Sequence, residues 1–433
     1  MRHASPSHAL AAIAAALVLS SPLGAEPTPS TALGPSPSTQ VRTRPSTELR
    51  AGSEVRALWV VRTTLTSPAA IATMVSSAKA GGFNTLLVQV RGRGDAYFQK
   101  GLEPKPPSLD AQPDFDPLAA TIAHAHDAGL QVHAWINVNL VANTGELPSA
   151  RGHVVFRHPE WLMVPRALAG ELVSVDPRSP GYLGRLARFV RGQSNELEGL
   201  YLSPVTPAAA AYTTGIIRDI VERYDLDGVH LDYIRYPRED FDYSAGALAA
   251  FRASLVDELN AADRGRYDAR AAGAEPTIYT LAYPQRWRAF RIERLTALLT
   301  AIRQAVKLVR PAAIVSAAVV PDANEAADRR LQDWRGWADA GLIDVVCPMA
   351  YTTDPAAFAA QIASAHEIAG GRPLWAGIGA YRLSPAQIAE NVHAARRIGA
   401  GGVILFSYDS LADPARGPGY LSQVGRAAFT GSQ

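Results

Sequence analysis

The sequence has 433 residues, 48% of them hydrophobic, and a formal net charge of +2 from 42 basic and 40 acidic side chains. This apolar content is enough for a sizeable core. The balanced charge, without a long basic run, argues against nucleic acid as a partner. We therefore expect a small molecule or a neutral polymer as the ligand.

The first 25 residues have the pattern of a signal peptide. Arg2 lies in a weakly basic start, residues 10–19 form a short apolar stretch, and residues 23–25 are the small residues that a signal peptidase accepts. About ten apolar residues are too few to cross roughly 30 Å of hydrocarbon. We predict a cleaved signal peptide at residues 1–25, no transmembrane segment, and an exported protein that is periplasmic or secreted.

The rest of the chain divides into a linker, one domain and a short tail. Residues 26–52 are rich in Pro, Ser and Thr and predict a flexible tether. From there the composition stays uniform, so we predict a single domain over 53–428 and a C-terminal tail over 429–433. The only cysteine, Cys347, excludes an intrachain disulfide, and its apolar surroundings predict an inert thiol.

Short apolar runs alternate with helical segments along this domain. Each run has about seven or eight residues, is rich in β-branched or aromatic side chains, and is bounded by Gly, Pro or Asp. The eight predicted strands are 56–62, 85–92, 131–137, 228–234, 314–321, 344–351, 374–381 and 402–409. Helices between them begin with Ser-Pro or Asp-Pro and end at glycine, as at Ser67, Asp116 and Ser384.

Eight such strands predict a closed (β/α)₈ barrel, because parallel strands need helical crossovers. The competing open, doubly wound sheet usually has a glycine-rich loop after the first strand, and "VVRTTLTSP" contains no glycine. Two long loops are predicted, at 138–212 after the third strand and at 235–313 after the fourth. Both would extend over the carboxyl-terminal face, where barrel active sites form.

Alternation along the strands brings polar side chains to the barrel interior. In residues 228–234 the interior side carries His230 and Asp232, with Asp232 near the carboxyl end. Neighbouring strands add Gln89, Arg91, His133, Trp135 and Asn137. The last three strands end in Tyr351, in Tyr381, and in Ser407, Tyr408 and Asp409. Because unpaired polar groups are costly to bury, this convergence predicts a site with Asp232 as the leading catalytic candidate.

Other interpretations of these residues stay open. The two histidines also fit core positions, and Arg91, Arg93 and Asp95 also fit a structural ion cluster. His133, His230 and Asp232 are metal-ligand types as well. The first strand, however, lacks the His-x-His pair typical of metal-dependent amidohydrolase-like barrels, and the sequence has no H-E-x-x-H motif. We therefore predict no metal and no cofactor.

Four blocks of the sequence stand out: "GGFNTLLVQVRGRGDAYF", "FDPLAATIAHAHDAGLQVHAWIN", "YDLDGVHLDYIRYP" and "LQDWRGWADAGLIDVVCPMAY". Together they resemble a known family, the exported barrel proteins called glycosyl-hydrolase-like family 10. The blocks occur in the family's order, and the resemblance covers roughly residues 54–425. It implies a (β/α)₈ barrel with a glycosidase site on the carboxyl-terminal face, and some relatives are linked to bacterial cell-wall glycan.

The resemblance also implies roles for individual residues. It marks Asp232 as the leading catalytic carboxylate, and it places Arg91 and Asp95 in the cleft. The sequence departs from the family pattern at two positions. Many relatives have a second acid where Tyr233 stands, and relatives often have proline where Gly92 stands. A mechanism with two adjacent acids is therefore not expected here.

Glycoside hydrolysis normally uses two carboxyl groups, one as acid and one as nucleophile or base. With Asp232 as the first, the candidates for the second are Asp409, which we favour, then Asp322, with Asp95 and Glu325 as further choices. Asp409 ends a predicted strand, and the other three follow one. The sequence does not single out one of them.

We predict an exported glycoside hydrolase that cleaves a polysaccharide, with bacterial envelope glycan as the leading substrate. Aromatic residues near the mouth of the barrel would stack on sugar rings. These are Trp135, Tyr233, Tyr236, Tyr351 and Tyr381. The alternatives are a glycan-binding barrel without hydrolytic activity and a metal-dependent hydrolase.

Overall fold

A computed structural model describes residues 53–273 and 275–430 of the chain. The predicted signal peptide at 1–25 and the predicted linker at 26–52 lie outside these residues, as do residues 431–433 of the predicted tail. The last described helix, α16, ends at Phe429. Within the described ranges, no helix has both the length and the apolar composition that a membrane span needs.

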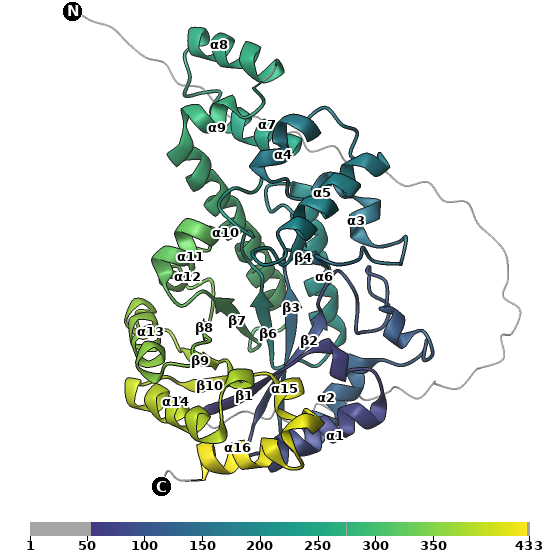
Figure 1. Ribbon diagram of the computed structural model, residues 1–433, viewed down its shortest axis with the longest axis vertical. Coiled ribbons are helices and arrows are strands. Elements are labelled where there is room, and N and C mark those ends of the chain that lie inside the picture. Colours follow the sequence, from purple (N-terminus) through teal and green to yellow (C-terminus); the bar gives the residue numbers. More distant parts are fainter. Residues whose placement is uncertain (1–52, 274, 431–433) are drawn as a thin grey trace, which may run out of the picture. The chain divides into compact units, whose positions relative to one another are not determined.

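Eight parallel strands close into a barrel, which confirms the predicted fold class (Figure 1). Around the barrel they follow the order β1, β10, β9, β8, β7, β6, β3, β2. The strands are β1 (Val55–Val60), β2 (Thr85–Arg91), β3 (Gln131–Asn137), β6 (Gly228–Asp232), β7 (Ile314–Val319), β8 (Val345–Ala350), β9 (Trp375–Ile378) and β10 (Gly402–Phe406). Each coincides with one predicted run, because alternating apolar residues between turn signals are a strong strand signal.

The two faces of the closed sheet carry two separate apolar cores. Side chains that point outward, such as Val88 and Ala134, pack with the surrounding helices in the main core. Those that point inward, such as Trp59 and Trp135, form a second cluster that fills the barrel. Cys347 belongs to this interior cluster, and burial raises the pKa of its thiol, as expected for an inert side chain.

Helices connect the strands and cover the outside of the barrel. They are α1 (Pro68–Ala80), α2 (Pro117–Asp127), α6 (Pro207–Arg223), α10 (Pro284–Val309), α12 (Trp334–Asp339), α13 (Pro355–Ile368), α14 (Pro385–Ile398) and α16 (Tyr420–Phe429). The predicted capping signals are confirmed: the side chains of Ser67, Asp116 and Ser384 accept hydrogen bonds from backbone N–H groups of the first helical turn.

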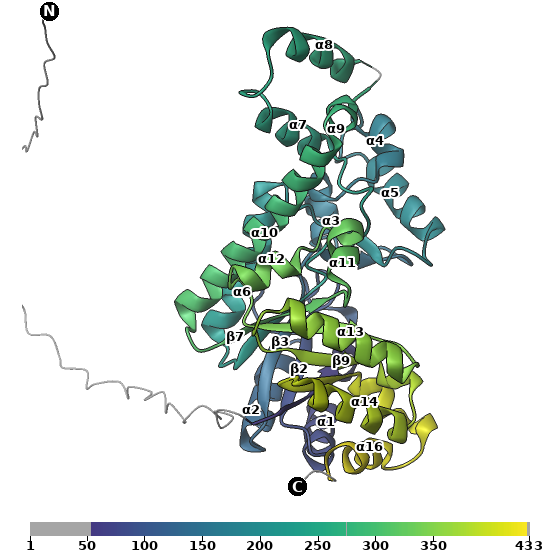
Figure 2. The ribbon, with the colours of Figure 1, turned by 90° about the vertical axis from the view of Figure 1, so that its left-hand side faces the viewer.

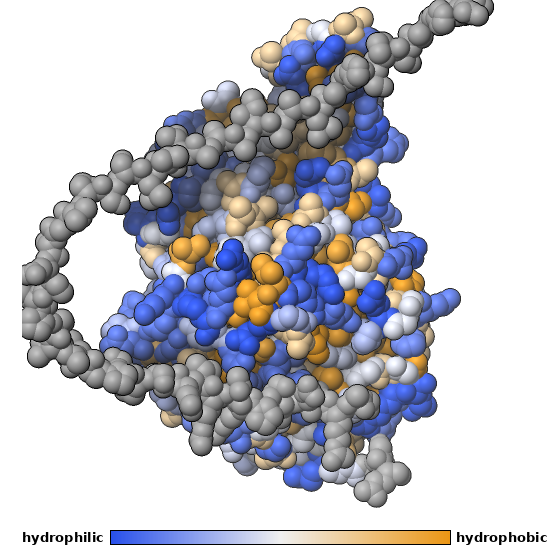
Figure 3. All heavy atoms as spheres, turned by 180° about the vertical axis from the view of Figure 1, so that it is seen from behind, coloured by the Kyte–Doolittle hydropathy of each residue, from blue (hydrophilic) through white to orange (hydrophobic). Residues whose placement is uncertain are grey.

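The two long connections are folded segments rather than irregular loops. The connection after β3 contains an antiparallel pair, β4 (Leu140–Asn143) and β5 (Gly199–Tyr201), and the helices α3 (Val154–Arg157), α4 (Arg166–Leu172) and α5 (Pro180–Gly192). The connection after β6 contains α7 (Ala245–Ser254), α8 (Ala261–Ala272) and α9 (Ile278–Ala282), whose apolar residues form a small core of their own with the start of α10. Figure 2 shows these helices beyond the ends of the barrel strands. The surface in Figure 3 is largely hydrophilic, with small apolar groups between the polar side chains.

Candidate active site

Asp232 is the last residue of β6, and its side chain lies at the carboxyl-terminal mouth of the barrel. In the sheet it is paired with Asn137 of β3, and its residue is 7% exposed. Oδ2 accepts a hydrogen bond from Trp135 Nε1 at 3.1 Å, and Oδ1 accepts one from the backbone N–H of Tyr233 at 2.7 Å. Burial nevertheless raises the pKa of Asp232 above its ordinary value. The carboxyl is thus suited to hold a proton and donate it.

Asp232 opens on a cavity of about 220 Å³ with aromatic walls. These walls are the side chains of Trp59, Trp135, Tyr233, Tyr351 and Phe406. Tyr351 and Phe406 stack on each other, with ring centroids 5.6 Å apart. Flat apolar rings around a buried carboxyl suit the face of a sugar ring. The cavity has room for about one such ring.

Three arginines complete the lining of this cavity: Arg62, Arg93 and Arg235. Arg62 lies 3.6 Å from Asp95 and donates to Gln89. The guanidinium of Arg235 lies over the ring of Tyr233, 4.6 Å from its centroid. Cationic side chains therefore outnumber the single carboxyl in the pocket of Asp232.

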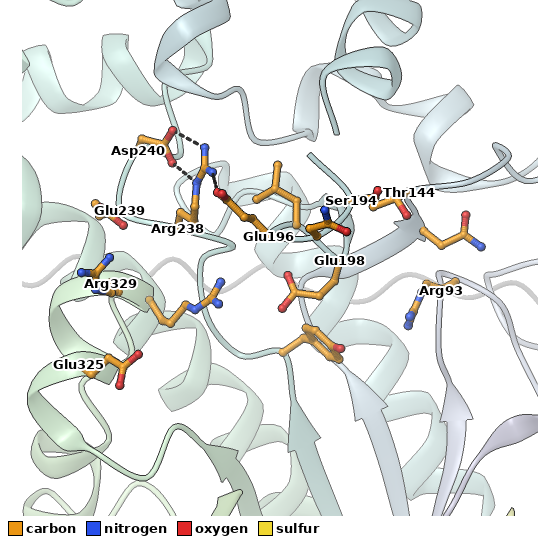
Figure 4. A pocket seen from close by; sticks show the side chains of 15 residues that line it. Arg93, Thr144, Ser194, Glu196, Glu198, Arg238, Glu239, Asp240, Glu325 and Arg329 are labelled. Carbon is orange, nitrogen blue, oxygen red and sulfur yellow. Dashed lines mark hydrogen bonds and ion pairs between the residues drawn. The ribbon is translucent and has the colours of Figure 1, made fainter. Parts of the chain in front are cut away.

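A second, larger cavity of about 1350 Å³ is shown in Figure 4. It adjoins the first, because Arg93 and Tyr233 line both. Most of its other lining residues are polar or charged. The acids among them are Glu196, Glu198, Glu239, Asp240 and Glu325. Arg238 joins two of these acids, because it donates to Asp240 and to Glu196. A cavity of this size exceeds that of small-molecule sites and fits a polymer better.

Glu198 differs from the other acids of the larger cavity, because it is tied to the pocket of Asp232. Its Oε1 accepts from Arg235 Nη2 at 2.8 Å, and its Oε2 accepts from the Tyr201 hydroxyl at 2.9 Å. Burial alone would raise the pKa of Glu198, but Arg235, Arg330 and the hydrogen bond from Tyr201 together outweigh burial and hold that pKa below its ordinary value. Glu198 therefore stays ionised, while Asp232 is shifted the opposite way.

Sequence reasoning missed Glu198, which precedes the three-residue strand β5 inside the segment predicted as a loop. No strand or helix signal marks its position. One signal for it was Arg235, three residues after Asp232. A buried arginine needs a carboxylate partner, so an acid from another segment could be expected beside it. Trp59, Arg62 and Phe406, which also line the pocket, were not among the predicted site residues.

The carboxylates predicted as partners of Asp232 have structural roles. Asp409, at the start of α15 (Tyr408–Leu411), accepts from the backbone N–H of Val61 at 2.8 Å and from the Thr64 hydroxyl at 2.5 Å. Asp322 is exposed and caps α11 (Ala323–Arg330). Neither lines the pocket of Asp232. Among the described residues, neither carboxylate forms an ion pair with an arginine of that pocket, as Glu198 does with Arg235, so the structure does not support the preference for Asp409 and then Asp322.

Arg91 of β2 does not face the barrel interior, contrary to the prediction from the sequence. The pairing of β2 with β3 shifts between Gln89 and Arg91, so that Arg91 is paired with the outward-facing Ile136. This irregularity turns Arg91 out of the barrel. There it forms a fully buried two-bond ion pair with Glu103, at 2.8 and 2.7 Å. Arg91 is a structural residue of the connection after β2.

Asp95 stabilises the turn that follows this strand. Its Oδ1 accepts from the backbone N–H groups of Gly92 at 3.1 Å and Arg93 at 2.8 Å. It therefore positions Arg93, which lines both cavities, and does not line either cavity itself.

Three further predicted binding residues lie in the core. His133 is fully buried in the barrel, and burial lowers its pKa to about 4. His230 accepts from Trp59 Nε1 at 3.0 Å and contacts Ser316 at 2.9 Å, and burial lowers its pKa to about 3. Tyr236 is fully buried, and its hydroxyl donates to the Arg291 carbonyl at 3.5 Å. These side chains support the barrel, and none of the three lines either cavity.

The remaining predicted binding residues lie in or next to the pocket. Trp135, Tyr233 and Tyr351 line it. Asn137 accepts from Trp135 Nε1 at 3.1 Å and so shares that donor with Asp232. Tyr381 is 36% exposed and lies edge-on to Tyr351, with centroids 6.3 Å apart. In the described part of the chain, no group of three or more His, Cys, Asp or Glu side chains could hold a metal ion.

Comparison with known proteins connects this geometry to a family. The model of the family described as glycosyl hydrolase-like 10 matches residues 54–184 and 184–372, which confirms the predicted family. Glycosyl hydrolase DigH of Escherichia coli is 25% identical over 300 residues, or 62% of this chain and 55% of DigH. Glycosyl hydrolase YngK of Bacillus subtilis is 26% identical over 162 residues, or 36% of this chain and 26% of YngK. The chain thus spans about half of DigH and about a quarter of YngK.

Solved structures share the barrel at low sequence identity. The glycoside hydrolase domain of PgaB from Bordetella bronchiseptica has a TM-score of 0.58 at 15% identity, covering 86% of this chain and 98% of that domain. An α-L-fucosidase from Paenibacillus thiaminolyticus has a TM-score of 0.57 at 17% identity, covering 87% of this chain and 49% of the fucosidase. At these identities the likeness concerns the fold.

Proposed function

The chain belongs to the glycosyl hydrolase-like 10 family, and from this premise we propose that it is an exported enzyme that hydrolyses glycosidic bonds within a bacterial envelope polysaccharide. The observation that carries the proposal is Asp232, a buried carboxyl with a raised pKa in an aromatic-walled pocket at the mouth of the barrel. The signal-peptide pattern of residues 1–25 supports export. The large adjoining cavity supports a polymeric substrate.

In the proposed mechanism, Asp232 is the general acid. It transfers its proton to the glycosidic oxygen as the bond from that oxygen to the anomeric carbon breaks. Trp135 Nε1 and the backbone N–H of Tyr233 then stabilise the carboxylate that Asp232 becomes. Burial raises the pKa of Asp232 and so favours its protonated form, the form from which a general acid acts.

Glu198 is the second carboxylate of this mechanism. Arg235 and Tyr201 hold it ionised and fix its orientation. Attack of a water molecule, with its proton taken by Glu198, inverts the anomeric configuration, whereas attack by Glu198 itself followed by water retains it. Proton NMR of the first product identifies the route. In both routes one water molecule is consumed and Asp232 is the proton donor of the first step.

The proposed function is tested with the full chain and two substrates, denuded peptidoglycan glycan strands and a neutral β-linked glycan. We expect new reducing ends from the strands, measured by mass spectrometry of the products, and their loss in Asp232→Asn. Asp322→Asn is the matched control, because an exposed N-cap Asp is replaced there by another good N-cap residue.

Two other outcomes would contradict the proposal. Binding of either glycan by the wild type without any product would indicate a glycan-binding barrel. Activity that a chelator abolishes would indicate a metal-dependent hydrolase instead of catalysis by carboxyl groups alone.

A further inference from the structure

Arg62 enters the pocket of Asp232 from the segment that follows β1. It begins the short 3-10 turn η1 (Arg62–Thr64), two residues after the strand ends. Asp409 anchors this segment, because it accepts a hydrogen bond from the backbone N–H of Val61 at 2.8 Å. The side chain of Arg62 lines the pocket and is 21% exposed. Its guanidinium can therefore contact a ligand in the pocket.

Three neighbours fix the orientation of this guanidinium. Nη1 of Arg62 donates to Gln89 Oε1 at 2.7 Å, and Nε lies 3.6 Å from Asp95 Oδ2. The Tyr97 hydroxyl interacts with it as well. A guanidinium has five N–H donors, so these three partners do not use all of them. Because Asp95 balances the charge of Arg62, a ligand at the remaining donors does not have to be an anion.

Gly92 provides the space in which Arg62 lies. A methyl group at residue 92 would be 2.5 Å from Arg62 Nη1 and 2.6 Å from Arg62 Cδ, which is closer than such atoms can approach. The backbone of Gly92 is held on both sides, since its N–H donates to Asp95 at 3.1 Å and its carbonyl accepts from Asn137 at 2.8 Å. A side chain at residue 92 would therefore displace the flexible Arg62 and leave the backbone in place.

Hydrogen bonds connect Arg62 with Asp232 along the wall of the pocket. Gln89, the acceptor of Arg62, donates to Asn137 Oδ1 at 3.5 Å. Trp135 Nε1 donates both to that oxygen and to Asp232, at 3.1 Å each. Arg62 and Asp232 thus line one cavity of about 220 Å³, which has room for about one sugar ring. A ring bound against Asp232 is therefore within reach of Arg62.

We propose that Arg62 donates hydrogen bonds to an uncharged oxygen substituent, a hydroxyl or an amide carbonyl, on the sugar bound against Asp232, and that Gly92 is the positioning residue that leaves room for it. The inference deepens the proposed function and rests on it. An uncharged acceptor leaves the ion pair of Arg62 with Asp95 intact, whereas a carboxylate would compete with Asp95 for the same cation.

The test measures binding by calorimetry, with the full chain carrying Asp232→Asn so that cleavage does not interfere. The probes are denuded peptidoglycan strands, the same strands after chemical reduction of their carboxyl groups to alcohols, and a neutral β-linked glucan. The strands offer hydroxyls, amide carbonyls and carboxylates. The reduced strands lack only the carboxylates, and the glucan offers only hydroxyls.

We expect Arg62→Ala to weaken binding of both forms of the strands equally, by roughly 10- to 100-fold, the range for a hydrogen bond to a charged group. A similar loss on the glucan assigns the contact to a hydroxyl, and any other result on the glucan assigns it to an amide carbonyl.

Gly92→Ala should weaken binding to a similar extent. Residue 92 does not have a left-handed backbone, so alanine fits the main chain and its methyl group displaces Arg62. In a chain that already carries Arg62→Ala, the same substitution should change Kd by less than about twofold, since the displaced atoms are gone. Gly145→Ala is the matched control, because a Cβ at this exposed glycine meets nothing closer than 3.5 Å. Melting temperatures check that every variant is folded.

Unchanged binding in Arg62→Ala, or losses that add up in the double variant, would overturn the inference. A loss confined to the unreduced strands would overturn the assignment to an uncharged oxygen. Both results are compatible with hydrolysis by the wild type, so failure of the inference is separate from failure of the proposed function. Binding that depends on Arg62 without any product from the wild type would contradict the proposed enzyme and leave the inference standing. Binding of none of the three probes would contradict both.

Discussion

The two adjoining cavities share Arg93 and Tyr233 but differ in the number and burial of the acidic side chains that line them. In the small one, a single carboxyl, Asp232, is buried among aromatic rings, and burial raises its pKa. The large one is lined by five acids and four arginines, and Arg238 pairs there with Glu196 and Asp240. The comparison shows that burial prepares a group for proton transfer, whereas paired, partly exposed charges offer hydrogen bonds to a long polymer.

Glu198 lies where the two cavities meet, and its substitution tests this comparison most severely. We expect Glu198→Gln to lower kcat by about 100- to 10,000-fold, the range for loss of an acid–base group. KM should change little, because glutamine keeps the shape of the side chain. Steady-state kinetics on glycan strands measures both constants.

The control for Glu198 is Glu325→Gln, which removes an exposed acid of the larger cavity. Its kcat should stay within about twofold of the wild type, since surface charges far from the reacting atoms contribute little. Equal losses in the two variants would mean that Glu198 has no special place among the acids of the larger cavity.

In the small cavity, Trp135 is the residue whose substitution tests the role of Asp232. Trp135→Phe keeps an aromatic wall but removes the hydrogen bond to Asp232 Oδ2. This hydrogen bond lowers the pKa of Asp232, so its loss should move the alkaline limb of the pH profile of kcat/KM to higher pH. Loss of one hydrogen bond to a charged group should also lower kcat/KM by roughly 10-fold. An unchanged alkaline limb would contradict the assignment of that limb to Asp232.

Asp232→Asn should raise the stability of the folded chain, although it removes activity. This gain in stability should be smaller than the kinetic effects described above. Since burial raises the folded-state pKa of Asp232 above the unfolded value of 3.8, the folded chain binds this proton more tightly. The free energy of unfolding therefore falls as the pH rises through that interval. Removing the group should raise the melting temperature at pH 7, and the difference should vanish below pH 3.8.

Thermal unfolding at both pH values checks this expectation, with Glu325→Gln as the variant that should show no gain. A lower melting temperature of Asp232→Asn at pH 7 would mean that the carboxylate stabilises the barrel. In that case the contrast between the two cavities would disappear.

The parts of the site that lie on regular strands could be predicted from the sequence. Alternation in β3 and β6 places Trp135 and Asp232 inward, and the register of the two strands sets Asn137 beside Asp232. The rule fails where the backbone departs from a regular strand. The shift after Gln89 turns Arg91 outward.

The alternation also stops where β6 ends. Tyr233 has a left-handed backbone with φ of 49°, so the alternation of β6 does not extend to Tyr236, which is buried in the core. Glu198 lies outside this reasoning altogether. Its position depends on a tertiary contact with Arg235 across 37 residues of chain, and no local pattern encodes such a contact.

The central claim is that Asp232 donates a proton to the leaving oxygen. The most direct test compares Asp232→Asn with the wild type on two substrates, the natural glycan and a dinitrophenyl glycoside of the same sugar. The dinitrophenolate group leaves without a proton, so it does not need a general acid. We predict a loss in kcat of about 100- to 10,000-fold on the glycan and a loss below about 10-fold on the dinitrophenyl glycoside. Equal losses on both substrates would contradict the claim.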